Sequence, residues 1–410
     1  MPFVSVMPNS SLAYWAIYRI LPFVLLLWVV LLRTLKLRDY PSVRFGPPEL
    51  SMLILGIIVP SSILLLQAHP NVPLIRFGDR FLLPFCMYLV IRLTAPRERE
   101  FVWLQWVAVF IAVSQSLIWF LSWYAPQRLP EVWHYLQGAR TTGSLKDPDL
   151  YAAILTFAGM ILIHSAVNRK SGLVRLGFLL ATSLCAVFAF LSLERAAWLG
   201  GFFVTIGLMI LYPKTMFRLI LIGCIVIAIM ANGILSSHID LSVKRFSETN
   251  QIYDRFVVFD AMLQMFRMKP VWGWGYETLD DNIQPFYRRV GEASLTRMIT
   301  SHNTYLTVLT ELGLVGFILY MFPVVWWLVL SIRVWRRIPD EGLWSKKLLA
   351  VIWLGMLFQF IVSNFFDMRW FPIGLTLWWL MLGLIADIVY PYLKGRDIGA
   401  TVPINGHSNG

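Results

Sequence analysis

Residues 302–332 read HNTYLTVLTELGLVGFILYMFPVVWWLVLSI, a short polar start that leads into a long apolar run. The apolar run is long enough to cross the roughly 30 Å hydrocarbon core of a bilayer as a helix. His302 therefore stands where a polar loop meets a predicted membrane helix. A capped helix start with an incidental histidine would give the same local pattern, so its interpretation depends on the rest of the chain.

The helical period places His302 on one face of this segment together with Gly313 and Gly316. Small residues on a membrane helix let a neighbouring helix approach closely, which gives the two glycines a structural role. Glu311 points to the opposite face at membrane depth, where a carboxylate is costly unless it is paired or faces water. The pattern predicts a helix packed against a neighbouring helix on its histidine side.

The composition indicates a membrane protein. The chain has 410 residues, of which 58% are hydrophobic and only 14% charged, and it contains 18 Trp and 15 Tyr. Apolar runs of membrane-spanning length recur, so we expect an all-α polytopic membrane protein rather than a soluble domain. No cleavable signal peptide is recognised before the first span, which would act as the insertion signal itself. The cysteines form neither a metal-ligand nor a disulfide pattern.

About 11–12 transmembrane helices are predicted from length and polarity. The spans are residues 12–32, 50–68, 79–95, 101–124, 149–167, 173–192, 196–212, 216–234, 303–332, 347–366 and 370–390. The predicted organisation is N-terminal transmembrane helices, one large periplasmic loop with surface helices, C-terminal transmembrane helices and a disordered cytoplasmic tail. These parts correspond to residues 1–235, 236–301, 302–392 and 393–410.

Basic residues in the short loops predict the orientation of the chain. Lys and Arg concentrate in one alternate set of loops and are sparse in the other set. The basic set lies at residues 33–44, 92–99, 169–175, 214–218, 333–347 and 394–396. Because short cytoplasmic loops carry the excess of Lys and Arg, we expect the N-terminus outside and the C-terminus in the cytoplasm. The long loop then lies on the outer face.

The outer face holds the residues that could carry chemistry. Arg195 lies in a very tight turn, Arg255 lies on a predicted helix of the large loop, and His302 can exchange protons near neutral pH. Arginine binds two phosphate oxygens at once, and histidine can accept a proton from a hydroxyl. The competing interpretations are an interfacial arginine at Arg195 and a solvated charge at Arg255.

The helix that carries Arg255 is predicted to present an apolar stripe. Such a helix either lies along the membrane surface or packs on the bundle. The predicted stripe consists of Ile252, Phe256, Phe259, Leu263 and Phe266.

Other chemistries are weakly represented in the sequence. We find no glycine-rich nucleotide loop and no zinc-like histidine spacing. The pair Asp280-Asp281 is more simply explained as solvated carboxylates than as a cation site. Intramembrane charges, which mark transporters, are sparse, with Arg19 and Glu311 as the main candidates. The net charge of +12 is distributed as in a membrane protein, so nucleic acid is not an expected partner.

Four motifs, in order along the chain, resemble those of the O-antigen ligase superfamily, which includes polysaccharide polymerases. His302-Asn303 is followed after nine residues by Gly313-Leu-Val-Gly316. The segment 192–199, Ser-Leu-Glu-Arg-Ala-Ala-Trp-Leu, is similar to a family segment in which Ser-Arg-Gly is commoner than Glu-Arg-Ala. The other two matches are Asp254-Arg255 through the Pro270…Gly273-x-Gly275 turn, and Arg140-x-x-Gly143 through Asp147-Pro148-Asp149, with Asp in place of the family's Asn.

The resemblance implies a GT-C-like glycosyltransferase that uses a polyprenyl (undecaprenyl) diphosphate donor. It implies that Arg195 and Arg255 bind the diphosphate and that His302 activates or positions the acceptor hydroxyl. It also implies substrate contacts at Arg140, Asn303 and Tyr305. Neither a cofactor nor a metal ion is expected.

The resulting hypothesis is an O-antigen ligase in the bacterial inner membrane, with its active site facing the periplasm. Its expected partners are a lipid-linked oligosaccharide donor, a lipid A-core acceptor and membrane lipids. A polymerase, in which the acceptor is another lipid-linked repeat unit, remains the alternative because the motifs concern the donor. A transporter of the lipid-linked glycan is a third hypothesis, which internal inverted repeats would favour.

Overall fold

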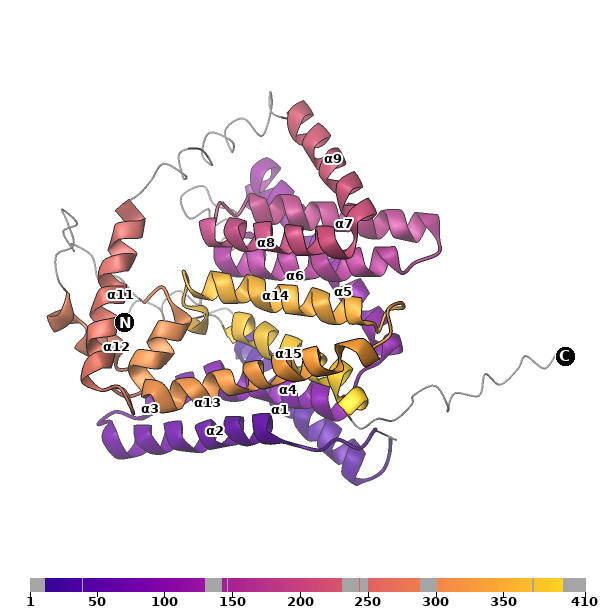
Figure 1. Cartoon of the computed structure of the whole chain (residues 1–410). Coiled ribbons are helices and arrows are strands. Elements are labelled where there is room, and N and C mark those ends of the chain that lie inside the picture. The colour runs from indigo at the N-terminus through magenta and orange to yellow at the C-terminus, as the bar shows by residue number, and fades with distance from the viewer. Residues whose placement is uncertain are drawn as a thin grey trace.

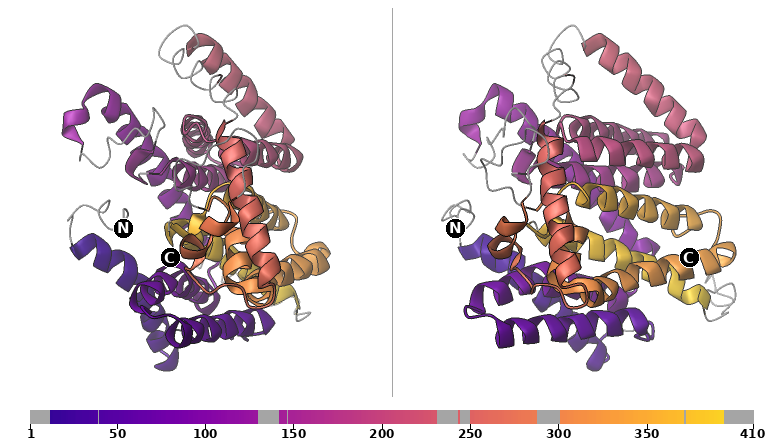
Figure 2. Two further views of the ribbon diagram at one scale, coloured as in Figure 1. Left: turned by 90° about the vertical axis from the view of Figure 1, so that its left-hand side faces the viewer. Right: turned by 60° about the vertical axis from the view of Figure 1, so that its left-hand side comes forward.

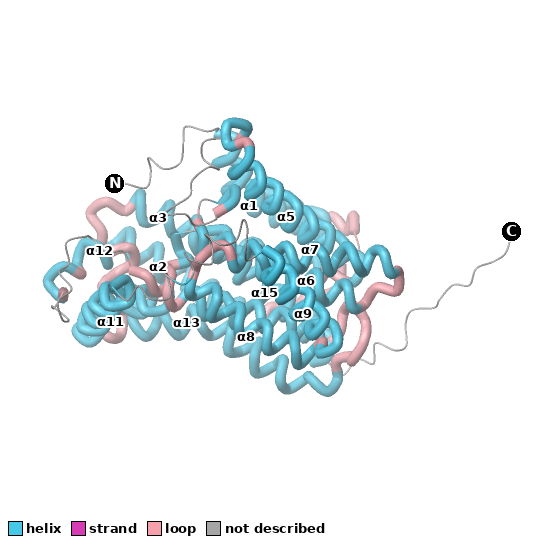
Figure 3. The backbone as a smooth tube through the Cα atoms, turned by 90° about the horizontal axis from the view of Figure 1, so that it is seen from above, coloured by secondary structure: helices cyan, strands magenta, loops and turns pink. Residues whose placement is uncertain are grey.

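The computed structural model describes residues 12–38, 40–129, 142–145, 147–230, 243, 250–287, 301–370 and 372–393. Helices form nearly all regular structure in these ranges, and they contain no strand (Figure 3). The helices are α1 (Leu12–Thr34), α2 (Pro47–Leu66), α3 (Asn71–Phe77), α4 (Leu83–Thr94), α5 (Glu98–Tyr124), α6 (Pro148–Val167), α7 (Gly172–Phe190), α8 (Arg195–Leu211), α9 (Pro213–Met230), α11 (Asn250–Met268), α12 (Leu279–Asn282), α13 (Thr304–Val334), α14 (Lys346–Ser363) and α15 (Pro372–Leu393).

Each span expected from the sequence overlaps one of these helices, but the predicted number of 11–12 transmembrane helices is not confirmed. In the described part of the chain, seven helices are long and apolar enough to cross a membrane. Two further apolar helices, at Ile20–Thr34 and Arg195–Leu211, are shorter. The all-helical membrane architecture is therefore confirmed. The predicted periplasmic placement and the GT-C-like class stay predictions.

Side chains at the helix starts explain where two central helices begin. The side chain of Asp147 accepts a hydrogen bond from the backbone amide of Leu150, 2.8 Å away, at the start of α6. Pro148 follows at the first helical position, where its missing N–H costs nothing. Asn303 caps α13 in the same way, through the amide of Leu306 at 2.8 Å.

The long helices stack side by side from α2 at the bottom of Figure 1 to α7 and α8 at the top. α6 and α15 form the interior, because most of their residues are buried within the bundle. α11 lies across one end of the stack, as the views turned toward that end show (Figure 2). We call this the α11 end; α8 and α13 begin there, and it also carries residues 364–370 of the loop between α14 and α15, the α14–α15 loop (Figure 1).

Two glycines bring α8 close to α14. A Cβ added at Gly200 would lie 2.8 Å from the ring of Phe358, and one added at Gly207 would lie 2.4 Å from Leu354. Small residues at such a seam allow the close packing that holds membrane helices together. This contact fixes the position of Arg195, the first residue of α8, relative to the bundle.

α11 packs on the bundle, but through a face other than the predicted stripe. Its buried side chains include Val258, Ala261, Met262 and Met265, which cluster with loop residues after the helix. Two members of the predicted stripe, Phe256 and Leu263, are exposed, by 58% and 40%. α11 has apolar residues on both sides, and its contact with α13 determines which side the bundle buries. The alternative that the stripe lies along the membrane surface stays a prediction.

α13 is broken at Gly313, which has φ 65° and ψ −169°. Four backbone hydrogen bonds to the turn 270–275 satisfy the groups that the break exposes. The amides of Trp274 and Gly275 donate to the carbonyls of Thr310 and Glu311, at 3.1 and 2.8 Å. The amides of Leu314 and Val315 donate to the carbonyls of Pro270 and Val271, at 2.8 and 3.2 Å. Non-helical backbone at membrane depth is tolerated where protein satisfies it in this way.

The break corrects the prediction for Gly313 and Gly316. The neighbour of Gly313 is the 270–275 turn and not a helix: a Cβ at Gly313 would lie 2.3 Å from the carbonyl oxygen of Val271. A Cβ at Gly316 would meet Leu312 of the same helix at 2.3 Å. The single apolar face that began at His302 does not continue, because the helical period is interrupted between the two glycines.

A buried charge pair joins α2 and α4 away from the α11 end. The Nε of Arg92 lies 3.3 Å from Oε1 of Glu49, which also accepts a hydrogen bond from the hydroxyl of Tyr88 at 2.6 Å. The guanidinium lies 5.3 Å from the ring centroid of Trp327 and 5.0 Å from that of Tyr390. The sequence pattern does not reveal this pair, since both residues lie near predicted span ends.

Candidate functional site

His302 lies in the short segment that leads into α13, beside the α14–α15 loop. Thr304 fixes this neighbourhood: its Oγ1 accepts a hydrogen bond from the amide of Met368 at 3.0 Å. The side-chain Nδ2 of Asn303 donates a hydrogen bond to Oδ1 of Asn364 at 3.4 Å. The two residues that follow His302 are thus hydrogen-bonded to the α14–α15 loop, which joins the start of α13 to that loop.

The structure brings Arg255 and His302 together from separate segments. The pKa of His302 is lowered to about 4, chiefly because burial disfavours the imidazolium and further because the charge of Arg255 repels it. Asp367 acts in the opposite direction and raises this pKa. His302 is therefore neutral at pH 7, which is the form that can accept a proton.

Arg195 lies at the same end of the bundle, on a different helix. It is the first residue of α8 and half-buried. The turn before it is tight, and Leu193 adopts a left-handed conformation with φ 57°, which costs free energy in a non-glycine residue. A cation at a helix N-terminus is opposed by the helix dipole, whereas an anion bound there is favoured by both the dipole and the arginine.

The other predicted site residues have different surroundings. Arg140 lies outside the described residues. Asn303 is buried and caps α13, and Tyr305 is buried with its ring 4.8 Å from Phe360 and 6.4 Å from Trp378. These contacts give Asn303 and Tyr305 structural roles, and their proposed contact with substrate stays a prediction.

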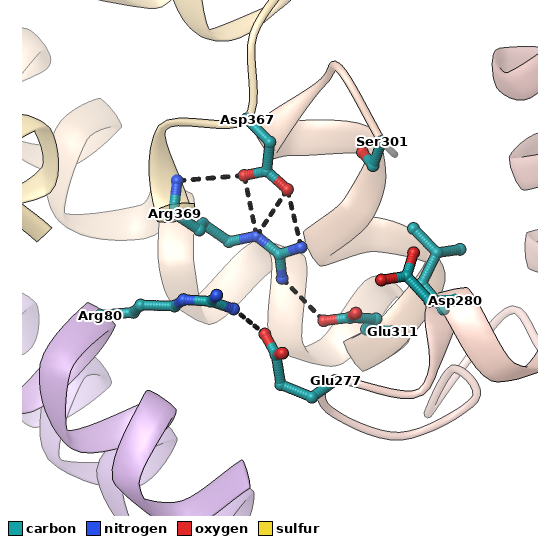
Figure 4. A pocket seen from close by; sticks show the side chains of 8 residues that line it. Arg80, Glu277, Asp280, Ser301, Glu311, Asp367 and Arg369 are labelled. Atoms are coloured by element: carbon teal, nitrogen blue, oxygen red, sulfur yellow. Dashed lines mark hydrogen bonds and ion pairs between the residues drawn. The ribbon is translucent and has the colours of Figure 1, made fainter. Parts of the chain in front are cut away.

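Beside His302, the α11 end contains a cluster of buried charges that sequence inspection missed (Figure 4). Nη1 of Arg369 lies 2.7 Å from Oε2 of Glu311, and its Nη2 lies 2.9 Å from Oδ2 of Asp367. These three side chains join α13 to the α14–α15 loop. Glu311, which the sequence placed at a costly depth, is thus paired.

Two arginines from the N-terminal half of the chain bind a further carboxylate beside this cluster. Glu277 binds Arg76 at 2.6 Å and also binds Arg80. Glu277 has φ 60°, so its backbone is held in a conformation that non-glycine residues seldom adopt. Together with Glu277, Arg80 and the three charges described above, Asp280 and Ser301 line a small cavity of about 10 Å³, room for about one water (Figure 4).

The signal for this cluster was present in the sequence, but only in part. Asp367 and Arg369 are two charges within a very short loop on the same predicted face as His302. Such a pair between two spans could have been chosen as a candidate. Nothing in the local sequence indicates that Glu277 and Arg80 meet, because their contact joins distant loops.

Residues 178–321 match the family described as O-antigen ligase. This stretch of the chain resembles the O-antigen ligase domain. A comparison with curated proteins gives no match. The O-antigen ligase match confirms the resemblance inferred from the motifs. The matched range contains Arg195, Arg255 and His302, and it ends within α13 after the break at Gly313.

Proposed function

We propose that the protein transfers a glycan from a polyprenyl (undecaprenyl) diphosphate donor to a lipid A-core acceptor, on the periplasmic side of the inner membrane. The observation that supports this most directly is that Arg255 and His302, both within the O-antigen ligase match, lie close enough to interact. The guanidinium of Arg255 can bind phosphate oxygens, and the neutral imidazole of His302 can accept a proton.

In the proposed reaction the acceptor hydroxyl oxygen forms a bond to the anomeric carbon of the donor glycan. The hydroxyl proton passes to His302, and the bond between that carbon and the phosphate oxygen breaks. The diphosphate leaves with the bonding electron pair. Arg255 and Arg195 stabilise the added negative charge, a task that guanidinium groups can perform in place of a metal ion.

The division of roles between His302 and Arg255 can be tested with purified protein and labelled donor. We expect His302→Ala to bind the donor normally and to slow single-turnover transfer by roughly 10²–10⁴-fold, the usual contribution of a general base. Arg255→Ala should instead weaken donor binding. Arg267→Ala, an exposed arginine on the same helix, is the matched control. Equal loss of donor binding in the His302 and Arg255 variants would make the histidine a donor ligand.

The cell-surface polysaccharide of a deletion strain distinguishes a ligase from a polymerase. Full-length polymer that is not attached to the lipid A core indicates a ligase. Single repeat units attached to the core indicate the polymerase. The wild-type gene should restore the normal pattern, and a gene carrying His302→Ala should not. A deletion strain with unchanged surface polysaccharide would contradict both functions.

A further inference from the structure

A cavity of about 310 Å³ lies between α2, α13 and the 270–275 turn. This volume is at the lower end of the range of about 300–1,000 Å³ that ligand sites occupy. Along the membrane helices its lining is apolar, with Leu55 and Val59 from α2 and Leu312, Val315 and Leu319 from α13. The break at Gly313 shapes the cavity, since it displaces the first part of α13 from the line of the rest.

One end of the cavity is polar and cationic. Gln67, Lys269 and Thr278 line it there, and Gln67 is held by a hydrogen bond of 2.7 Å to the carbonyl of Tyr276. Nζ of Lys269 lies 4.1 Å from the ring centroid of Trp274, which also lines the cavity. The cation is therefore positioned beside the opening rather than free to swing away.

The surface around this end suits the level of lipid head groups. Trp272 lines the cavity and is 65% exposed, and its neighbours Met268 and Val271 are 65% and 51% exposed. Exposed tryptophan and lysine next to apolar side chains are typical of the membrane–water interface. A molecule that fills the cavity thus needs an apolar chain for the membrane helices and an anionic head for Lys269.

We propose that this cavity binds one acyl chain of an anionic phospholipid, whose phosphate contacts Lys269. Arg195 and Arg255, the proposed ligands of the donor diphosphate, do not line the cavity, so the lipid site is separate from the proposed donor site. Glu311 lines the inner end, but its carboxylate is bound to Arg369 (Figure 4). The bound chain fills the space between α2 and the break in α13.

The proposal is tested by native mass spectrometry of the whole protein from nanodiscs that contain phosphatidylglycerol and phosphatidylcholine. The wild-type protein should retain phosphatidylglycerol. Ser62→Trp places an indole in the cavity and should lower the retained lipid at least fivefold. We expect the wild-type protein to prefer phosphatidylglycerol about fivefold, the effect of one lysine near a phosphate. Lys269→Glu should remove this preference.

Two control variants lie on the same helices but outside the cavity lining. Leu64→Trp is at a 60% exposed position of α2, and Arg267→Glu is at an exposed position of α11. Both should retain the lipid as the wild-type protein does. If Ser62→Trp and Leu64→Trp retain equal amounts of lipid, the lipid does not bind in this cavity. If Lys269→Glu still prefers phosphatidylglycerol, Lys269 does not bind the anionic head group. Displacement of phosphatidylglycerol by an equimolar polyprenyl phosphate would assign the cavity to the prenyl lipid instead.

Discussion

His302 and Arg255 come from segments separated by the 270–287 loop region, yet the arginine's charge acts on the imidazole. Burial first, and this repulsion second, lower the pKa of His302, so the imidazole is neutral and able to accept a proton at pH 7. If Arg255 binds the donor diphosphate as proposed, the bound anion raises the pKa of His302. Donor binding would then be coupled to proton acceptance through these two side chains.

The pH dependence of transfer should reflect the lowered pKa of His302. Its pKa is about 4, below the usual 6.5, so the neutral form persists as the pH falls and is lost only near pH 4. We expect the acid limb of single-turnover transfer to lie well below pH 6.5. Arg255→Gln removes one cause of the lowering, so the limb should move to higher pH while burial still acts. If the acid limb lies at the same pH in Arg255→Gln and in the wild-type protein, both at saturating donor, Arg255 does not affect the protonation of His302.

The same pKa predicts how stability depends on pH. An unfolded chain protonates His302 near pH 6.5, whereas the folded protein does so only near pH 4. The histidine's contribution to stability is therefore lost as the pH falls from about 6.5 to about 4. Since His302→Gln cannot titrate, its thermal stability should decline less over this interval.

Arg195→Lys should impair transfer although it keeps the positive charge. Lysine lacks the planar fork that binds two phosphate oxygens at once. The tight turn before α8 leaves the side chain little freedom to compensate. We expect weaker donor binding in an equilibrium titration, with Arg128→Lys, at an exposed position, as the control. Normal binding and transfer by Arg195→Lys would make Arg195 an ordinary interfacial charge.

Among the helices, α13 has the largest effect on the site. Its first part carries Glu311 and is tied to the α14–α15 loop, whereas its second part packs on α2. The charges that join these elements are buried, and breaking a buried ion pair on one side leaves a charge without compensation. Arg369 is the centre of this arrangement, because it binds both Glu311 and Asp367.

Replacing Arg369 should destabilise the protein more than replacing Glu311. Arg369→Met leaves two buried carboxylates without their guanidinium, at a cost of about 3–5 kcal/mol. Glu311→Gln removes one partner while Asp367 continues to bind the arginine. We expect thermal unfolding in detergent, followed by tryptophan fluorescence, to show a clearly larger fall in Tm for Arg369→Met. Equal falls would mean that Asp367 contributes little.

The helices could be predicted from the sequence, but their contacts only in part. Apolar runs identify membrane spans because a spanning segment must satisfy its own backbone. The buried side of α11 could not be predicted, since both its sides offer apolar residues and packing on α13 decides between them. The motifs predicted His302 and Arg255 at one site, and the charge of Arg255 acts on His302 in the structure, while their roles stay predictions. Glu277 was missed because its partners, Arg76 and Arg80, come from a distant loop.

At the scale of the whole molecule, the helix directions place the candidate residues at one end. Arg195 begins α8, Arg255 lies on α11 and His302 directly precedes α13, and these parts of the chain lie at the α11 end (Figure 1). The opposite end carries the loops richest in Lys and Arg. From the positive-inside rule we predict that the α11 end faces the outer side of the membrane.

Cysteine labelling can test this orientation. Cys86 and Cys185 are buried and Cys224 is exposed, so Cys224→Ser provides the background for the experiment. Gln284→Cys, exposed at the α11 end, should react with a membrane-impermeant maleimide added to cells from outside. Glu341→Cys, exposed at the opposite end, should react only after the membrane is permeabilised. The reverse pattern would move the proposed active site to the cytoplasm.

The backbone contact between the 270–275 turn and Gly313 also bears on biosynthesis. The turn precedes the apolar run 302–332 in the sequence, so its partner groups for the break are synthesised before α13. The hydrogen bond from the amide of Met368 to Thr304 can form only later, because Met368 lies in the loop between the last two helices. The surroundings of His302 are therefore completed only when the final helical hairpin has been inserted.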